Sequence, residues 1–318
     1  MATTVLGLKT FTASDPVDYN EINDNYNKID NGLKTAMQGR AAHNWLDNSD
    51  MTNVINQRGA SSYTGQVYGI DRWRGRAVAQ TVSVRTADVT VTATGTSYAG
   101  IKQKVHGMPR LAGKTVTFAA RLYANVVPEL VLFDASEQSL AVKMGTSGAT
   151  QTLILTYAVP TDATADSVVP TIMIRTSASG DYMRIVWAAL YEGAYTADTL
   201  PAYQPKGFAA ELAEAQRYYI HDMGRFTQGI IMPSGVLRVS YPVPTTMRTN
   251  PTVIVNNLDN AVVFSNGYST VIALTACSFY NKKDNAILVD FSTNINAGDY
   301  KHCVATTYAT SISLSADL

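Results

Sequence analysis

The chain has 318 residues and balances 25 Lys and Arg against 25 Asp and Glu, so its formal net charge at pH 7 is zero. Charged residues make up only 16% of the sequence, where roughly 25% is typical of globular proteins. This composition argues against binding to nucleic acid, whose affinity depends on many Lys and Arg contacts with phosphate, and against binding to anionic membranes. Apolar residues reach 46%, enough for substantial cores, and the length allows two domains with an additional segment.

Targeting and cofactor signals are weak in this sequence. The beginning, MATTVLGLKT, lacks the basic start and the apolar core of a signal peptide. The longest uncharged apolar run, residues 185–191, is too short to cross a bilayer. Two cysteines, Cys277 and Cys303, cannot form a disulfide framework, and their spacing from the histidines does not indicate a metal site. We therefore expect a protein made in a reducing cytoplasm, without membrane insertion, metal or cofactor.

Residues 1–44 are predicted to form an N-terminal segment built around a helix. Asp15 suits the N-cap, Pro16 the first helical position and Asp18 the acidic first turn. Apolar residues then recur at alternating steps of three and four: Tyr19, Ile22, Tyr26, Ile29 and Leu33. This narrow seam is typical of a short coiled coil, and Ile at both d positions with none at a favours three or four strands over two. An ordinary amphipathic surface helix is the alternative, because about two and a half heptads are marginal for an isolated helix.

Residues 45–202 carry strand signals throughout. In residues 115–122, for example, Val116, Phe118, Ala120 and Leu122 fall on one face of an alternating pattern. Turn clusters such as residues 145–148 separate the strands at a spacing typical of a β-sandwich, and no helical period lies among them. The pattern predicts a β-sandwich domain.

Residues 203–222 are predicted to be a helical linker. Pro201 and Pro205 end the preceding sheet, and a helix over 208–219 follows. Its apolar residues again recur at steps of four and three: Phe208, Leu212, Ala215 and Tyr219. This second stripe is compatible with packing on a three-fold axis and equally with a connector packed on one sheet.

Residues 223–318 return to strands joined by short loops rich in Asn, Gly and Asp, which predicts a C-terminal β-sandwich tip. Several loops combine polar side chains with tyrosines, whose rings offer a flat face to a sugar and whose hydroxyls can bond to its polar rim. The candidate glycan-binding residues are Asp259, Asn260, Tyr268, Tyr280, Lys282, Tyr300, Lys301 and His302. The alternative is that they are ordinary hairpin turns with tyrosines packed on their own sheet.

Several stretches resemble bacteriophage tail fibres and receptor-binding proteins. The opening N-W-L-D-N-S (44–49), N-Q-R-G (56–59) and Y-G-I-D-R-W (68–73), and the closing W-A-A-L-Y-E-G (187–193), are similar to phage jelly-roll modules related in fold to carbohydrate-binding modules. The E-L-A-E-A-Q-R-Y-Y helix (211–219) and the Y-P-V-P-T-T-M-R-T-N-P-T-V stretch (241–253) resemble the entry to a fibre tip, although the second threonine before Met247 departs from the usual pattern. Residues 15–30 resemble the virion-proximal start of such proteins.

The resemblance implies a mainly β homotrimer with a short coiled-coil helix, a jelly-roll body, a helical linker and a β-sandwich tip. It implies attachment of the N-terminus to another virion protein, in the tail or baseplate, and binding of the tip or body to a host surface polysaccharide. The location would be the virion, after synthesis in the host cytoplasm.

Two other functions compete with this one, a purely structural fibre such as a collar or head fibre, and a polysaccharide depolymerase. Hydrolysis of a glycosidic bond usually needs two carboxylates flanking the bond, and the sequence after Glu214 contains no glutamate. The Gly145-Thr146-Ser147-Gly148 turn mimics a nucleophile elbow but lacks the strand-to-helix context. We expect no catalytic residues. Arg58, Asp71 and Arg72 are expected to form a structural polar contact, with a role in ligand binding as the alternative. Trp45, Trp73 and Trp187 are expected to lie in the core, with a role as sugar-stacking platforms as the alternative.

Overall fold

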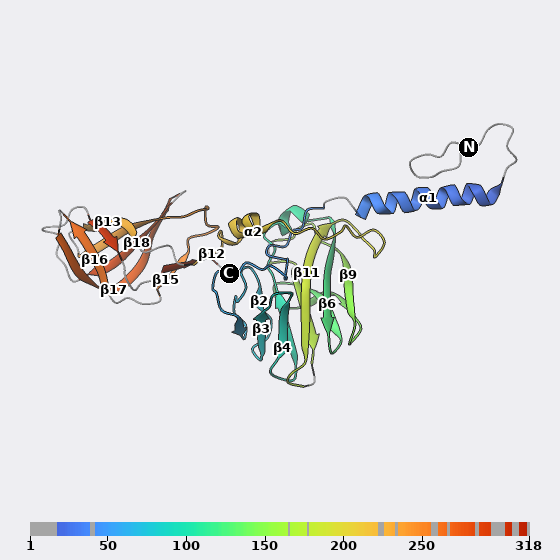
Figure 1. Ribbon diagram of the computed structural model, residues 1–318, viewed down its shortest axis with the longest axis horizontal. Helices are drawn as coiled ribbons and strands as arrows, with labels where there is room; N and C mark the ends of the chain where they lie inside the picture. Colours follow the sequence, from blue (N-terminus) through green and yellow to red (C-terminus); the bar gives the residue numbers. More distant parts are fainter. Residues whose placement is uncertain are drawn as a thin grey trace, which may run out of the picture.

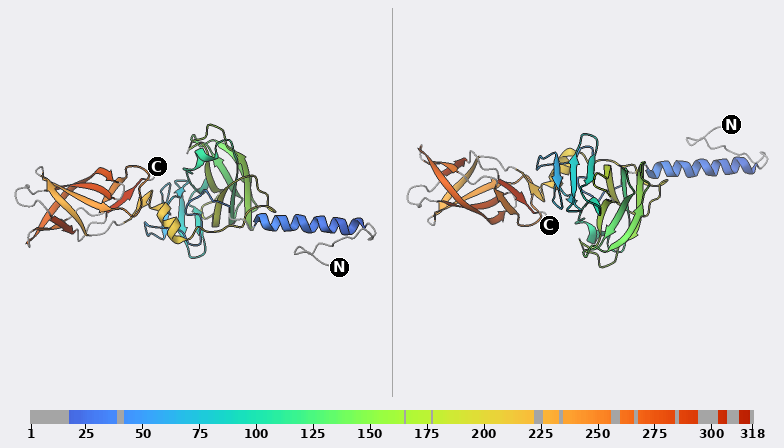
Figure 2. Two further views of the ribbon diagram at one scale, coloured as in Figure 1. Left: turned by 90° about the horizontal axis from the view of Figure 1, so that it is seen from above. Right: turned by 90° about the horizontal axis from the view of Figure 1, so that it is seen from below.

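The computed structural model describes residues 18–38, 42–164, 166–176, 178–221, 226–232, 235–255, 260–265, 268–283, 286–293, 303–306 and 312–316. These parts are mainly β, with two α-helices and several antiparallel sheets, which confirms the predicted fold class. Figures 1 and 2 show a helix at one end, a β-sandwich in the middle and a β-barrel at the other end.

The helix α1 (Tyr19–Gln38) projects from the sandwich, as Figure 1 shows. Asp18 is the capping residue, because its side chain accepts a hydrogen bond from the Asn20 N–H at 2.8 Å. Asp15 and Pro16, which the sequence favoured as cap and first position, lie outside the described residues. Tyr19, Tyr26 and Leu33 are 75%, 66% and 58% exposed. The expected apolar seam therefore exists on the helix, and most of it is open.

The sandwich consists of two antiparallel sheets. The six-stranded sheet has the order β1 (Ser62–Thr64), β3 (Gln80–Val84), β4 (Val89–Ala93), β11 (Tyr182–Glu192), β6 (Thr115–Ala124) and β9 (Thr150–Ala158). The five-stranded sheet has the order β2 (Arg74–Gly75), β5 (Tyr98–Lys102), β10 (Val169–Arg175), β7 (Pro128–Phe133) and β8 (Ser139–Met144). A short 3-10 helix, η1 (Met108–Leu111), connects β5 and β6. Because the chain passes repeatedly from one sheet to the other, the fold is a jelly roll.

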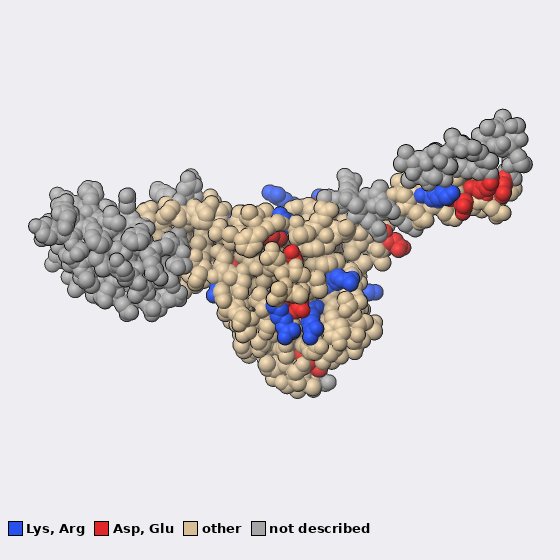
Figure 3. All heavy atoms as spheres, in the orientation of Figure 1, with Lys and Arg blue, Asp and Glu red and all other residues tan. Residues whose placement is uncertain are grey.

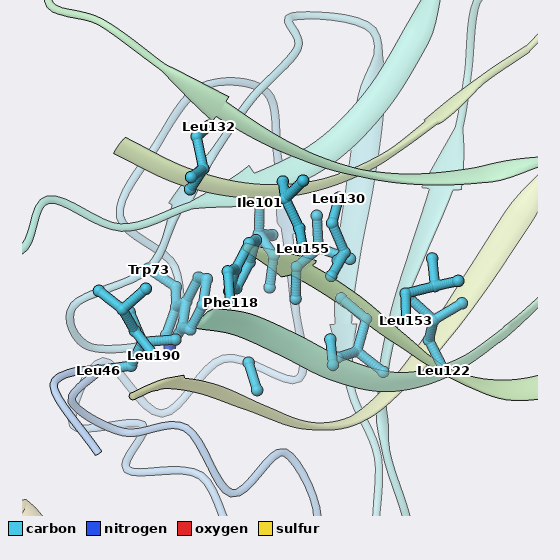
Figure 4. Packing of buried hydrophobic residues seen from close by; sticks show 14 of the residues in the cluster. Leu46, Trp73, Ile101, Phe118, Leu122, Leu130, Leu132, Leu153, Leu155 and Leu190 are labelled. Carbon is cyan, nitrogen blue, oxygen red and sulfur yellow. The ribbon is translucent and has the colours of Figure 1, made fainter. Parts of the chain in front are cut away.

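The core lies between these two sheets and is formed by large aliphatic and aromatic side chains (Figure 4). Phe118 and Leu122 of β6 are fully buried, as their alternation predicts. Trp73 is 1% exposed, and its indole N–H donates to the Asn48 carbonyl at 2.8 Å. Trp45 and Trp187 were also expected in the core but are only half-buried. Each fully buried large side chain contributes roughly 1.5–3 kcal/mol.

The C-terminal part forms a closed barrel, where the sequence predicted a two-sheet sandwich. Its strand order is β13 (Phe226–Met232), β14 (Val236–Pro242), β18 (Ala286–Thr293), β17 (Tyr268–Lys283), β16 (Asn260–Ser265) and β19 (Cys303–Thr306). The barrel closes because β19 pairs with both β13 and β16. β17 is 16 residues long and has two register shifts, which bend it around the barrel. Alternating side chains look the same in a sandwich and a barrel, so only the long-range pairing distinguishes them.

A small three-stranded sheet stands between the sandwich and the barrel. Its order is β12 (Tyr219–Ile220), β20 (Ile312–Ser315) and β15 (Thr252–Val255). The helix α2 (Phe208–Ala215) immediately precedes β12. This sheet brings the end of the described chain back to the strand that leaves the sandwich.

The junction between the sandwich and this sheet depends on two arginine–carboxylate pairs, each with one buried and one half-buried member. Arg58 bonds to Asp71 at 2.8 Å, and Arg72 bonds to Asp47 at 2.9 Å. The sequence therefore predicted the contact between Arg58 and Asp71 correctly, whereas Arg72 takes a different carboxylate. Burial acts to raise the pKa of Asp47, but the charges of Arg72 and Lys206 hold it below its ordinary value.

The same two guanidinium groups stack on consecutive tyrosines beyond α2. The Arg72 Cζ lies 3.6 Å from the Tyr218 ring centroid, and the Arg58 Cζ lies 3.7 Å from that of Tyr219. The Gln57 side chain donates to the Tyr219 carbonyl at 2.7 Å. The opening motifs of the sandwich and the end of the helical motif thus meet in one interface.

This interface changes the interpretation of the second stripe. Ala215 is fully buried and Tyr219 is 6% exposed, both within this chain, whereas Phe208 is 55% exposed and Leu212 is half-buried. The four residues therefore do not form one open apolar surface. α2 is a connector packed against its own chain along the side that carries Ala215.

We predict that Arg72→Ala destabilises the protein by about 3 kcal/mol. The substitution leaves the half-buried Asp47 carboxylate with only the more distant Lys206 as an ionic partner, and it removes the cation that stacks on Tyr218. Thermal or urea unfolding measures the change. Arg121→Ala is the matched control, because Arg121 is exposed and has no ion pair among the described residues. An equal loss in both variants would contradict the role of Arg72.

The junction should also respond to acid through His106, which stacks on Tyr218 with ring centroids 5.2 Å apart. Burial, with the charges of Arg72 and Arg248, lowers the pKa of His106 from 6.5 to about 4. As the pH falls, the histidine of the unfolded chain is protonated near pH 6.5, before His106 of the folded protein is protonated near pH 4. The contribution of His106 to the free energy of unfolding is therefore fully present above pH 6.5 and is lost as the pH falls toward 4. We expect His106→Gln to reduce the loss of unfolding free energy between these pH values, measured by urea unfolding. An unchanged pH dependence in the His106→Gln variant would contradict this role of His106.

Candidate functional site

A groove lies on the outer face of the five-stranded sheet. It encloses a cavity of about 100 Å³. Its lining includes Tyr68, Arg74, Lys102, Lys104, Phe133 and Glu137. These residues come from β2, β5, β7 and the loops beside them, so the site is built largely on strands.

The strand register explains why polar side chains gather there. Arg74 of β2 is paired with Lys102 of β5, and Phe133 of β7 is paired with Val169 of β10. The neighbours Ile101 and Leu132 belong to the core. Because side chains alternate between faces, Lys102 and Phe133 point away from the core, onto the outer face.

The wall of the groove is the hairpin between β7 and β8. Asp134 fixes its turn by accepting hydrogen bonds from the Ser136 and Gln138 N–H groups, both at 2.8 Å. Glu137 has a φ of 63°, a left-handed conformation that glycine or asparagine adopts more easily. Its carboxylate contacts Arg76 and Lys102, so the glutamate ties the hairpin to the sheet.

Arg76 extends this network across the sheet. Its guanidinium carbon lies 5.0 Å from the Tyr98 ring centroid and 4.8 Å from that of Phe133. Thr171 and Met173 of β10 lie on the same outer face by register, yet they are 0% and 4% exposed. We infer that the aromatic–arginine–aromatic row covers them and forms the floor beside the groove.

Most charges in the groove are paired. Lys104 bonds to Asp166 at 2.9 Å. Burial acts to raise the pKa of Glu137, but the hydrogen bond from Lys102 and the charges of Lys102, Arg76 and Arg74 hold it below its ordinary value. Glu137 is therefore a carboxylate at neutral pH. The groove offers hydrogen-bond donors and acceptors beside ring faces, which suits a polar ligand with little net charge.

The structure does not bring all of the predicted glycan-binding residues together. Asn260 begins β16, and Tyr268 begins β17. Tyr280 is the extra residue at a register shift of β17, and Lys282 lies near the end of that strand. Tyr268 and Lys282 thus lie near opposite ends of the 16-residue strand β17. Asp259, Tyr300, Lys301 and His302 lie outside the described residues.

Asp290, an acidic residue of the C-terminal part, forms two hydrogen bonds of 2.8 Å with the Arg238 guanidinium on the neighbouring strand. Among the described residues, no three His, Cys, Asp or Glu side chains are grouped for metal binding. Within the described chain, no helix combines the length and the apolar character needed to span a membrane.

Sequence reasoning missed the groove residues, because Tyr68 was considered only as part of a fold motif and the others carry no motif. One signal was present. The Asp134-Ala135-Ser136-Glu137-Gln138 turn places glutamate where a turn of this length often uses glycine. A side chain in a glycine-like position suggests a contact that outweighs the local strain.

No family model and no curated protein matches the chain. Among solved structures, it is similar to a CBM4 domain at 17% identity and a TM-score of 0.32, with 46% of this chain and 99% of that one covered. It is also similar to the CBM22-2 xylan-binding domain of Paenibacillus barcinonensis Xyn10C, at 12% identity and a TM-score of 0.30, with 42% of this chain and 98% of that one covered. A family 16 carbohydrate-binding module is similar at 14% identity and a TM-score of 0.27, with 36% of this chain and 86% of that one covered. Likenesses at these scores carry no argument about function.

Proposed function

We propose that this protein is a homotrimeric attachment protein that binds a surface glycan non-covalently through the groove of its jelly roll. The observation that carries the proposal is the groove itself, in which Tyr68 and Phe133 lie beside paired charges. A sugar ring has an apolar face that stacks on an aromatic ring and a polar rim that bonds to fixed donors and acceptors. The low charge of the chain agrees with such a ligand, and on the face of the sandwich that Figure 3 shows, charged side chains occur in small groups among uncharged ones.

The trimer is proposed from α1. A two-in-seven seam that stays exposed on a projecting helix is costly for a single chain in water, and association with identical helices would bury it. Identical copies also strengthen a weak site. Three linked grooves can raise apparent affinity by about 10²–10⁴-fold when all engage together.

The linear arrangement of helix, sandwich and barrel supports a fibre-like role (Figure 1). We propose that the chain is a bacteriophage tail fibre or receptor-binding protein. In this role the N-terminal segment holds another virion protein, in the tail or baseplate, and the β-structures face a host polysaccharide.

Binding is favoured over hydrolysis at the groove. A general acid for glycoside cleavage needs a raised pKa, whereas Lys102 and Arg76 lower the pKa of Glu137 against the raising effect of partial desolvation. A paired carboxylate of this kind accepts hydrogen bonds from sugar hydroxyls without donating a proton.

We predict that the full-length protein binds an oligosaccharide on a glycan array, and that Phe133→Ala weakens binding of that oligosaccharide about tenfold by removing a stacking face, which corresponds to about 1.4 kcal/mol. Isothermal titration calorimetry measures the affinity. Tyr195→Ala is the matched control, because Tyr195 packs on Tyr191 of the six-stranded sheet.

Three results would contradict this proposal. Equal affinities of the two variants would place the site elsewhere. A folded protein that binds no glycan would favour the structural fibre. Release of reducing ends from host polysaccharide would favour the depolymerase.

For the trimer, we predict that Ile22→Asn combined with Ile29→Asn lowers the mass in solution to one third, because polar side chains at both d positions disrupt the seam. Multi-angle light scattering measures the mass. Asn27→Ala with Asn31→Ala, on the helix face opposite the seam, should leave the mass unchanged. A single-chain mass for the unaltered protein would exclude the trimer, and an unchanged mass in the Ile variant would show that other surfaces join the subunits.

A further inference from the structure

A second hollow lies at the junction, away from the groove. It has a volume of about 210 Å³ and is lined by the start of the sandwich, η1 and the end of α2. The lining side chains that matter here are His43, Trp45, His106, Arg110, Arg217 and Tyr218. Hollows between packed structural units are common ligand sites, because several elements converge on them.

The acidic residues of this hollow are already neutralised. Asp47 pairs with Arg72 at 2.9 Å and with Lys206 at 3.5 Å. Lys206 also pairs with Glu214 at 2.7 Å. The carboxylates therefore do not leave a net negative charge toward the opening.

The basic residues are in excess. Arg110 and Arg217 are exposed, and among the described residues neither pairs with a carboxylate. Behind the hollow, the guanidinium carbons of Arg72 and Arg248 lie 3.6 Å and 5.7 Å from the centroid of the Tyr218 ring. The pKa of His106 is lowered to about 4, first by burial and then by Arg72 and Arg248, which agrees with a positive potential at this point.

An aromatic wall completes the hollow. A Cβ atom at Gly107 would come within 2.2 Å of the Trp45 ring, so the ring packs directly on the glycine backbone. The rings of His43 and Trp45 meet edge to face with centroids 4.7 Å apart. Trp45 is half-buried, although the sequence suggested a core position. Its partial exposure leaves ring surface for a ligand.

We propose that this hollow is a binding site for a small anion, whose carboxylate or phosphate group is held by Arg110 and Arg217 beside Trp45. A planar guanidinium can form paired hydrogen bonds with either group. Two arginines that pair with no described carboxylate, next to an aromatic ring, suit an acidic sugar or a phosphorylated compound. The hollow shares no lining residue with the groove, so anion binding in the hollow can be tested independently of glycan binding in the groove.

The test uses the full-length protein and three probes, sodium glucuronate, inorganic phosphate and glucose. Calorimetry at low salt should detect saturable binding of glucuronate or phosphate and none of glucose. Arg110→Ala and Arg217→Ala should each weaken binding of the anion about tenfold, because a hydrogen bond to a charged group contributes roughly 1.5–3 kcal/mol. Arg121→Ala, at an exposed arginine on the six-stranded sheet, should bind like the unaltered protein.

Trp45→Phe provides an independent readout. Anion binding should change the tryptophan fluorescence of the unaltered protein, and this change should be lost in the variant. If glucuronate binds more tightly than phosphate, the sugar ring contributes, and the natural ligand is an acidic saccharide. If phosphate binds as tightly, the site recognises the anion alone. Absence of saturable binding of both anions, or equal binding by the Arg110 and Arg121 variants, would overturn the proposal.

Discussion

The two arginine–tyrosine stacks at the junction are the interactions on which the arrangement of this molecule depends. Arg58 and Arg72 each bond to a buried or half-buried carboxylate of the sandwich and each covers a tyrosine of the segment after α2. A guanidinium can do both at once, because its edge carries the hydrogen-bond donors while its flat face stacks. A lysine could satisfy the carboxylate but could not stack in the same way. The chemistry of arginine thus joins the sandwich to the β-structure that follows.

This junction determines what remains free for function. Ala215 and Tyr219 are buried where α2 and the segment after it pack against the same chain, whereas the apolar seam of α1 is largely exposed. The apolar surface available for association is therefore concentrated at one end of the molecule. The groove lies on the outer face of the five-stranded sheet, which α1 does not cover in any view (Figures 1 and 2). Assembly and ligand binding can then use different surfaces.

The groove and the junction hollow differ in how their charges are balanced. In the groove, the single carboxylate of Glu137 pairs with both Lys102 and Arg76, and Glu137 adopts a strained backbone conformation to do so. In the hollow, Lys206 and Arg72 satisfy the carboxylates, and two further arginines are left without acidic partners among the described residues. One site therefore suits a neutral polar ligand and the other an anion. Both sites also contain half-buried aromatic side chains, Tyr68 and Phe133 in the groove and Trp45 in the hollow.

The sequence by itself determined the mainly β fold class and the regions of the chain that hold the two helices. The alternation in β6, the seam of α1 and the proline-bounded start of α2 follow from periods of two and 3.6 residues, which are local properties. The ion pair between Arg58 and Asp71 was also predictable, since both lie in short motifs near one another in the chain. The boundaries of the domains and the number of subunits stay predictions.

Only the tertiary structure decided the rest. Whether alternating strands close into a barrel depends on the pairing of β19 with β13 and β16, which no local pattern encodes. The groove joins Tyr68, Lys102 and Phe133 from separate strands and loops. The hollow joins Trp45, Arg110 and Arg217, which are far apart in the sequence. Sites of this kind arise from register and packing between distant segments, whereas a sequence pattern reports only which face of its own strand or helix a residue occupies.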